Sequence, residues 1–246
     1  MTVTTAGSGR QITELRAAVE PALRTLGTVT LIGVGCGIFV VGVLSRLAMF
    51  LLAQLNPTVS GVTSDDGFEI GQFTLAGSLN LALVVGPLFG IVGAGFYLAL
   101  RGLAIGPEWF RTLSLSLGPG VVVGAMIVHP DGVDFAMLDP LWLAVLLFVL
   151  VPAVYVVLLR LFVERVLAGP PWPRWATYVG VVAWLPLLPG FLLLAAGWAA
   201  LNALRRSETG SALLAHPAPA WIARGALTAI FVFLVLDLVN DVRLLT

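Results

Sequence analysis

The chain has 246 residues, of which 59% are hydrophobic and 11% are charged, whereas roughly 25% of residues are charged in an average soluble domain. Its 13 basic residues are all arginines and are balanced by 13 acidic residues, so the chain offers no basic surface for nucleic acid. Without lysine and with a single cysteine, it has no amine for a Schiff base or a phosphate-binding loop, and no intrachain disulfide or cysteine zinc cage.

Residues 1–25 are predicted to form a cytoplasmic segment with a short interfacial helix. The stretch QITELRAAVEPALRTL has apolar residues near helical spacing and mixed charge. A loosely ordered amphipathic lead-in would explain the same pattern. The apolar run that follows is too long and begins too late for a cleaved signal peptide, so we expect it to stay in the chain as an anchor.

The remaining chain, 26–246, is predicted to be a single transmembrane bundle. A helix needs about 20 mostly apolar residues to cross the hydrocarbon core of a membrane. Six segments meet this requirement: 26–54, 75–100, 112–128, 140–159, 177–204 and 219–240. The last is the weakest, because Arg224 and Asp237 lie within it. The expected fold class is all-α, a polytopic transmembrane helical bundle of six membrane-embedded segments.

The arginines predict the orientation of the bundle. They precede the first span and surround the second and fourth connections, whereas 55–74 and 129–139 contain acids and no arginine. The positive-inside rule therefore predicts a cytoplasmic N-terminus. Together with the span count, this predicts a multi-pass protein of the bacterial cytoplasmic membrane.

The fifth segment leaves two topologies open. If 177–204 crosses once, Arg205 and Arg206 lie outside and the C-terminus is cytoplasmic. If the chain turns back at LPLLPG, 185–190, both arginines return to the cytoplasm and the C-terminus lies outside. The charges favour the turn, but a turn inside the membrane leaves backbone groups to be satisfied. We expect six crossings, with the hairpin as the alternative.

Two outer connections suggest a surface feature. Asp66-Gly67 stands between Val62-Thr63 and 68–70, which predicts a short extracellular β-hairpin, because Asp-Gly suits the tight turn. The acids of these connections form a predicted extracellular rim: Asp65, Asp66, Glu69, Asp131, Asp134 and Asp139. Oxygen ligands of this kind could hold a divalent cation, but no known spacing matches. We therefore interpret the acids as the complement of the inner arginines, and predict no metal site.

Glycines and prolines predict how the helices pack. Gly33 and Gly37, Gly86 and Gly90, and Gly120 and Gly124 are each four residues apart, which permits close helix contact within the bundle or between two protomers. A GPxWxR pattern occurs at 106–111 and 169–174 and suggests a repeated two-helix unit. The helices after each copy contain the candidate breaks Pro119, Pro186, Pro189 and Gly190, a pattern found at transporter sites and also in ordinary kinked helices.

Two charges lie inside predicted spans, Arg46 and Asp237. A charge within the membrane is costly, so a pairing or functional role is the first hypothesis. Arg46 could also extend toward the outer headgroups. The two residues reach similar depth only if the fifth segment is re-entrant, so the pair and the hairpin are predicted together.

The stretches SRLAMFLLAQL, DDGFEIGQFTLAGSLNL, GIVGAGFYLALRGL and LFVER resemble a group of multi-span membrane proteins of actinobacteria with no assigned activity. The resemblance covers roughly the first two thirds of the chain. It implies location and fold, and it supplies no active residues.

The sequence offers no enzyme constellation. It has no GxSxG motif, and His129 and His216 lie at span edges, where they suit neither a catalytic base nor haem ligation. We therefore predict no cofactor and a non-enzymatic structural or accessory protein, whose partners are the lipid bilayer and another membrane protein or a second copy, and not nucleic acid. The alternative is a small carrier or lipid-handling protein that uses the third and fifth helices.

Overall fold

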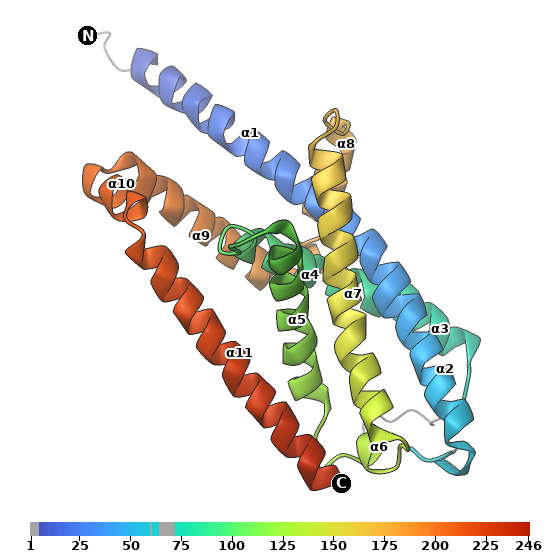
Figure 1. Cartoon of the computed structure of the whole chain (residues 1–246). Helices are drawn as coiled ribbons and strands as arrows, with labels where there is room; N and C mark the ends of the chain where they lie inside the picture. Colours follow the sequence, from blue (N-terminus) through green and yellow to red (C-terminus); the bar gives the residue numbers. More distant parts are fainter. Residues whose placement is uncertain (1–4, 60, 64–71) are drawn as a thin grey trace.

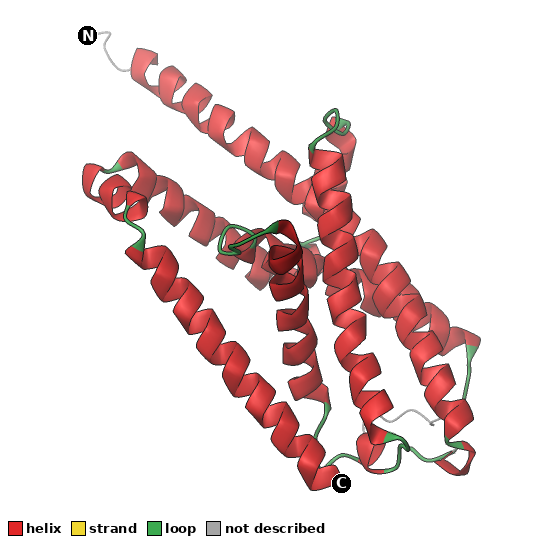
Figure 2. Ribbon diagram, in the orientation of Figure 1, coloured by secondary structure: helices red, strands yellow, loops and turns green. Residues whose placement is uncertain are grey.

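The computed structural model describes residues 5–59, 61–63 and 72–246 (Figure 1). Within these ranges the chain is helical and contains no strand (Figure 2). The predicted β-hairpin is therefore wrong. Val62 and Thr63 follow a short 3-10 helix, Pro57–Val59, and two residues are too few for a ladder. The Asp66-Gly67 turn and the second arm lie outside the described residues.

The first traverse of the bundle is one continuous helix made of three parts. These are α1, Thr5–Cys36, a π-helical stretch, Gly37–Leu44, and α2, Ser45–Leu55. Pro21 lies inside α1 and does not end it. The stretch predicted to form an interfacial helix is helical and continuous with the first membrane helix.

The second traverse runs back beside the first and consists of α3, Leu75–Asn80, a π-helical stretch, Leu81–Val85, and α4, Gly86–Leu100. Small residues allow the two traverses to touch through their backbones. A Cβ atom on Gly33 would lie 2.5 Å from the carbonyl oxygen of Gly90, and one on Gly86 would lie 2.7 Å from that of Gly37. These four glycines therefore join two helices of one chain, as the four-residue spacing predicts.

The third and fourth traverses pack tightly on each other. They are α5, Glu108–Ile127, and α7, Leu141–Leu167, and a single short helix turn, α6, Val133–Ala136, lies between them. A Cβ atom on Gly120 of α5 would lie 2.6 Å from the carbonyl oxygen of Val149 on α7. Tyr155 of α7 extends across the bundle and donates to the carbonyl oxygen of Gly90 over 2.8 Å. This bond connects α7 to the α1–α4 contact.

The segment after α7 turns back on itself. It consists of α8, Arg174–Val182, a 3-10 turn, Leu185–Leu187, and α9, Leu188–Arg206. The chain continues through α10, Glu208–Ala215, into α11, Ala218–Leu245. Figure 1 shows α10 at the end of the molecule where α11 begins, with the C-terminus at the other end.

The two ends of the bundle are identified by contacts that span the sequence. At the arginine-rich end, Arg224 at the start of α11 donates to the carbonyl oxygen of Leu103 over 2.9 Å. At the opposite end, a cluster gathers the last turns of α2, α5 and α11 and the first turns of α7, with Leu52, Val128, Ala144 and Leu238 among its members. Helix α11 therefore runs from the arginine-rich end to the opposite end.

The count of crossings follows from these contacts. Six helices are long and apolar enough to cross a membrane, in agreement with the sequence. The α1–α2, α3–α4, α5, α7 and α11 segments run along the bundle between its two ends (Figure 1). The α8–α9 segment begins and ends on the arginine-rich side. This course favours the alternative hairpin over a single crossing of 177–204, and Trp184 lies at its turn. Leu185–Arg206 is itself long and apolar enough to cross a membrane.

Candidate functional site

The turn between α8 and α9 is fixed by one buried indole. Trp184 is 3% exposed and donates its ring N–H to the hydroxyl oxygen of Thr30 on α1 over 2.9 Å. Its ring also fills the space that a side chain at Gly95 of α4 would occupy. The turn therefore meets two traverses, and its buried polar group is satisfied, as a turn at this depth requires.

The predicted break residues behave differently in the two helices. Pro186 lies in the 3-10 turn, and Pro189 and Gly190 open α9, so the fifth segment is broken as expected. Pro119 lies inside α5, which continues without interruption to Ile127. The third helix is therefore unbroken, and the two halves do not carry matching interrupted helices.

The two GPxWxR copies also differ in backbone structure. Gly106 has a positive φ of 89°, whereas Gly169 does not. In the first copy Pro107 caps the helix and Trp109 lies inside it, whereas in the second copy the helix begins at Arg174, after the tryptophan. The two copies of the GPxWxR pattern therefore have different local backbone structures.

A buried charge cluster lies at the arginine-rich end. Arg160 of α7 is 3% exposed, and its Nε donates to a carboxylate oxygen of Glu164 over 2.7 Å. One terminal nitrogen donates to the hydroxyl oxygen of Thr112 over 2.8 Å, and the other contacts the carboxylate of Glu108, at the start of α5. Arg111 completes the cluster at 3.4 Å from the same carboxylate. We call Arg160, Glu108, Glu164 and Thr112 the α5–α7 clasp.

The clasp is not predicted from the sequence. The fourth predicted span ends at 159, with Arg160 in the connection after it, whereas α7 continues to Leu167. The signal is the four-residue spacing of Arg160 and Glu164, which places both on one face of a longer helix. The arginine's donors are engaged by α5 and α7, so the clasp joins helices and leaves little capacity for a substrate.

Arg46 and Asp237 do not meet. The Nε of Arg46 donates to the hydroxyl oxygen of Ser78 over 3.1 Å, and its guanidinium lies 4.9 Å from the ring centroid of Phe73. Asp237 lies on α11, which packs on α5, and it is exposed. The structure therefore favours the hairpin without the ion pair that was predicted with it, and Arg46 instead bonds Ser78 of the second traverse.

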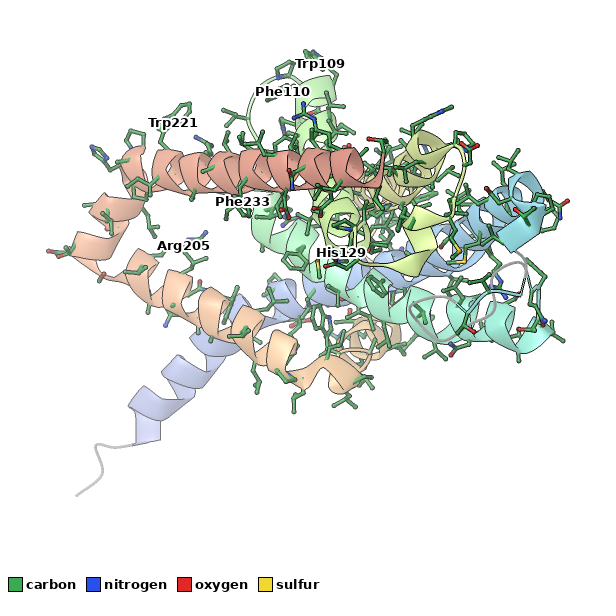
Figure 3. The ribbon with its side chains drawn as sticks, turned by 90° about the horizontal axis from the view of Figure 1, so that it is seen from below. Trp109, Phe110, His129, Arg205, Trp221 and Phe233 are labelled. Atoms are coloured by element: carbon green, nitrogen blue, oxygen red, sulfur yellow. The ribbon has the colours of Figure 1, made fainter. Side chains whose placement is uncertain are left out.

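The predicted acidic rim is described only in part. Asp65, Asp66 and Glu69 lie outside the described residues, and the side chain of Asp134 is not described. Asp131 and Asp139 are exposed. No group of three or more potential metal ligands occurs among the described residues. His129, labelled in Figure 3, lies at the end of α5, with its Nε2 2.6 Å from the carbonyl oxygen of Met126.

The least covered helices of the bundle are α9 and α11, although α11 packs on α5 along one side. Both helices are described in full and neither contains a buried residue, whereas the most apolar stretches of the other four candidate spans are 22% to 33% buried. Figures 1 and 3 show α9 and α11 diverging from α10 like the two sides of a V. We call residues 188–245 the α9–α11 arm.

An open groove of about 720 Å³ follows one face of α11. Its lining is almost entirely apolar and includes Trp221 and Phe233, both labelled in Figure 3. Gly225 lies in this groove with nothing within 4 Å of the place a Cβ atom would take, and Ala229 follows it by four residues. The guanidinium of Arg224 lies at the Trp221 end of the groove, 5.1 Å from the ring centroid of Trp221.

No protein-family model, curated protein or solved structure matches this chain. The resemblance to an actinobacterial group therefore stays an expectation. The helices identify the chain as a multi-span integral membrane protein.

Proposed function

We propose that this chain is a non-enzymatic protein of the bacterial cytoplasmic membrane that acts as an accessory or structural partner of another membrane protein. In this proposal the α9–α11 arm receives an apolar transmembrane helix of the partner. The N-terminus is cytoplasmic and the C-terminus lies outside. The positive-inside rule supports this orientation, because the connections that meet at the arginine-rich end hold most of the chain's cations.

The observation that carries the proposal is the open small-residue face of α11. Helices in lipid associate through close backbone approach at small residues spaced four apart. Gly33, Gly86 and Gly120 each lie against another helix of the chain. Gly225, with Ala229 one turn later, faces the open groove. This face is suited to a helix that the chain does not supply.

The chemistry of the groove indicates what the partner helix would present. The walls are apolar, so most of its surface would be aliphatic and small. Arg224 uses its Nε for the carbonyl oxygen of Leu103, and its two terminal nitrogens have no bond among the described residues. A carboxylate or carbonyl group at the same end of the partner helix would accept from them.

Site-specific photo-crosslinking tests this proposal. A photoreactive residue replaces Val232, which lines the groove, or Ile230, which is exposed on the other side of α11. Crosslinking in native membranes is expected to give one discrete protein product from position 232 and none from position 230. Gly225→Leu fills the groove and should lower the yield about tenfold.

The controls separate a partner site from a lipid-facing surface. The product from position 232 must contain a single membrane protein, and that protein, purified, must bind the purified chain but not the Gly225→Leu variant. Equal products from positions 230 and 232, or a yield unaffected by Gly225→Leu, would refute the proposal.

The re-entrant α8–α9 segment favours a second candidate function, a small carrier or lipid-handling protein. Re-entrant backbone inside a membrane commonly lines a solute path. In vesicles reconstituted with the purified chain, uptake that is lost in Pro189→Ala would support this candidate. Pro119→Ala should leave such uptake unchanged, because α5 is unbroken.

A further inference from the structure

A second site lies where α1 meets the connection between α7 and α8. A cavity of about 140 Å³ opens there at the arginine-rich end, between the helices and the 168–173 connection. It is formed because α8 lies unusually close to α1. A Cβ atom on Gly27 would lie 2.5 Å from the carbonyl oxygen of Thr177. Beside this contact, Thr28 of α1 and Thr177 of α8 line the cavity.

Two threonines of the cavity are buried without partners. Thr28 of α1 is 7% exposed and Thr177 of α8 is 8% exposed, and both line the cavity. Neither hydroxyl has a hydrogen bond among the described residues. No side-chain nitrogen or oxygen there is both sealed from solvent and unpartnered, so these hydroxyls open onto the cavity. Because these hydroxyls reach the cavity and have no bond within the described residues, they are free to donate to a group bound in it.

The charges at the cavity mouth favour an anion. Arg24 lines the cavity and uses one terminal nitrogen for Glu20, at 2.6 Å. A terminal nitrogen of Arg174 lies 4.0 Å from the same carboxylate oxygen of Glu20. Two guanidinium groups therefore share one carboxylate, which leaves a net positive charge. The remaining N–H groups of Arg24 have no other bond among the described residues, so the cavity presents donors of guanidinium and hydroxyl type.

Apart from Thr25, whose hydroxyl donates to the carbonyl oxygen of Pro21, the rest of the lining is apolar and matches the edge of a membrane. Val166 and Leu167 end α7, and Trp172 stands beside them in the connection. Tryptophan and arginine gather where the hydrocarbon meets the headgroups. A group that is anionic at one end and apolar at the other would satisfy both kinds of wall.

We propose that this cavity binds a phosphate group, carried by a phospholipid headgroup or by a soluble phosphoester. The guanidinium of Arg24 and the hydroxyls of Thr28 and Thr177 donate to its oxygens. This site shares no residue with the α9–α11 arm. The phosphate site and the partner role are therefore tested by separate experiments.

The test measures binding to the full purified chain in a nonionic detergent by native mass spectrometry. The probes are phosphatidylglycerol, glycerol phosphate and inorganic phosphate, and phosphatidylglycerol is expected to give one retained molecule per chain. Thr28→Val with Thr177→Val keeps the side-chain shapes and removes two hydrogen bonds to a charged group, which should weaken binding at least about tenfold. Thr228→Val on α11 is the matched control and should leave binding unchanged.

Two single variants, Gly169→Leu and Arg24→Gln, test the same cavity if the paired threonine variant folds poorly. Gly169→Leu fills the mouth, where a Cβ atom would meet only ordinary contacts of 3.5 Å or more, and it should abolish retention. Arg24→Gln should weaken binding, whereas Arg206→Gln, at the same end, should not. Binding of glycerol phosphate or inorganic phosphate with this pattern assigns the site to a soluble phosphate. Equal retention of all probes by wild type and cavity variants overturns the proposal.

Discussion

The indole N–H of Trp184 and the hydroxyl oxygen of Thr30 are joined by a 2.9 Å hydrogen bond that connects residues 154 positions apart. This bond attaches the α8–α9 turn to α1. With the turn held there, α9 leads back to the arginine-rich end and α11 makes the last crossing.

Accessibility labelling tests this topology. In a Cys36→Ser background, Thr209→Cys and Leu245→Cys place single thiols in α10 and at the end of α11. Because α11 runs between opposite ends of the bundle, we expect an impermeant reagent outside intact cells to label position 245 and not position 209. Thr58→Cys, in the first outer connection, serves as the positive control. Labelling of 209 alone would restore six crossings.

Trp184 and Thr30 should contribute unequally to stability. Thr30→Val leaves a buried indole N–H without an acceptor and should cost about 1–3 kcal/mol. Trp184→Ala also opens a cavity between α1, α4 and α9 and should cost about 3–5 kcal/mol. The free energy of unfolding in mixed micelles measures both. Trp175→Ala is the control, since Trp175 is exposed on α8, and a cost as large as that of Trp184→Ala would contradict this account.

Local chemistry made much of this fold predictable. Long apolar runs gave the number of embedded helices, and the glycine spacings at Gly33 and Gly90 predicted a close contact between helices. The hairpin was visible only as a conflict between Arg205, Arg206 and the length of 177–204. Its resolution depends on the bond between Trp184 and Thr30, and no local pattern pairs residues so far apart.

The α5–α7 clasp should respond asymmetrically to mutation. Arg160 is buried, whereas the carboxylates of Glu108 and Glu164 are 70% and 50% exposed. Glu108→Gln with Glu164→Gln leaves a buried charge uncompensated and should cost about 3 kcal/mol. Arg160→Met leaves two carboxylates that water solvates and should cost less than about 1 kcal/mol.

Unfolding in mixed micelles again provides the measurement. Glu20→Gln is the matched control for the paired glutamate variant, because Glu20 bonds an arginine that is itself partly exposed. Its cost should stay below about 1 kcal/mol. If Arg160→Met proved more damaging than the loss of both carboxylates, the clasp would be held by packing and not by charge.

Glycine-to-alanine substitutions, which add one methyl group, test the glycine contact between the first two traverses. Gly37→Ala would press against the carbonyl oxygen of Gly86, so the helices must separate, at a cost of about 1–3 kcal/mol. Gly35→Ala lies two residues away with nothing within 4 Å. It should be neutral or slightly stabilising, because alanine favours the helix. Equal effects of the two variants would show that the two helix backbones do not touch at Gly37.

The candidate sites were less predictable than the fold, for a physical reason. Arg46 and Asp237 were singled out because charges in membranes are rare, yet Arg46 is satisfied by Ser78 and Phe73. The cavity at Thr28 and Thr177 depends on two ordinary threonines that the crossing of α1 and α8 brings together. A residue indicates a site in the sequence only when its type is unusual for its surroundings. Threonine is an ordinary residue type and gives no such signal.

The late position of the arm in the chain also affects how the protein is made. The α1–α4 contact and the α5–α7 clasp involve only residues before 168, so they can assemble while the ribosome is still adding the remainder. Residues 188–245 then leave the ribosome beside four traverses that can already be packed. A neighbouring helix could therefore reach the exposed faces of the arm as soon as it is made.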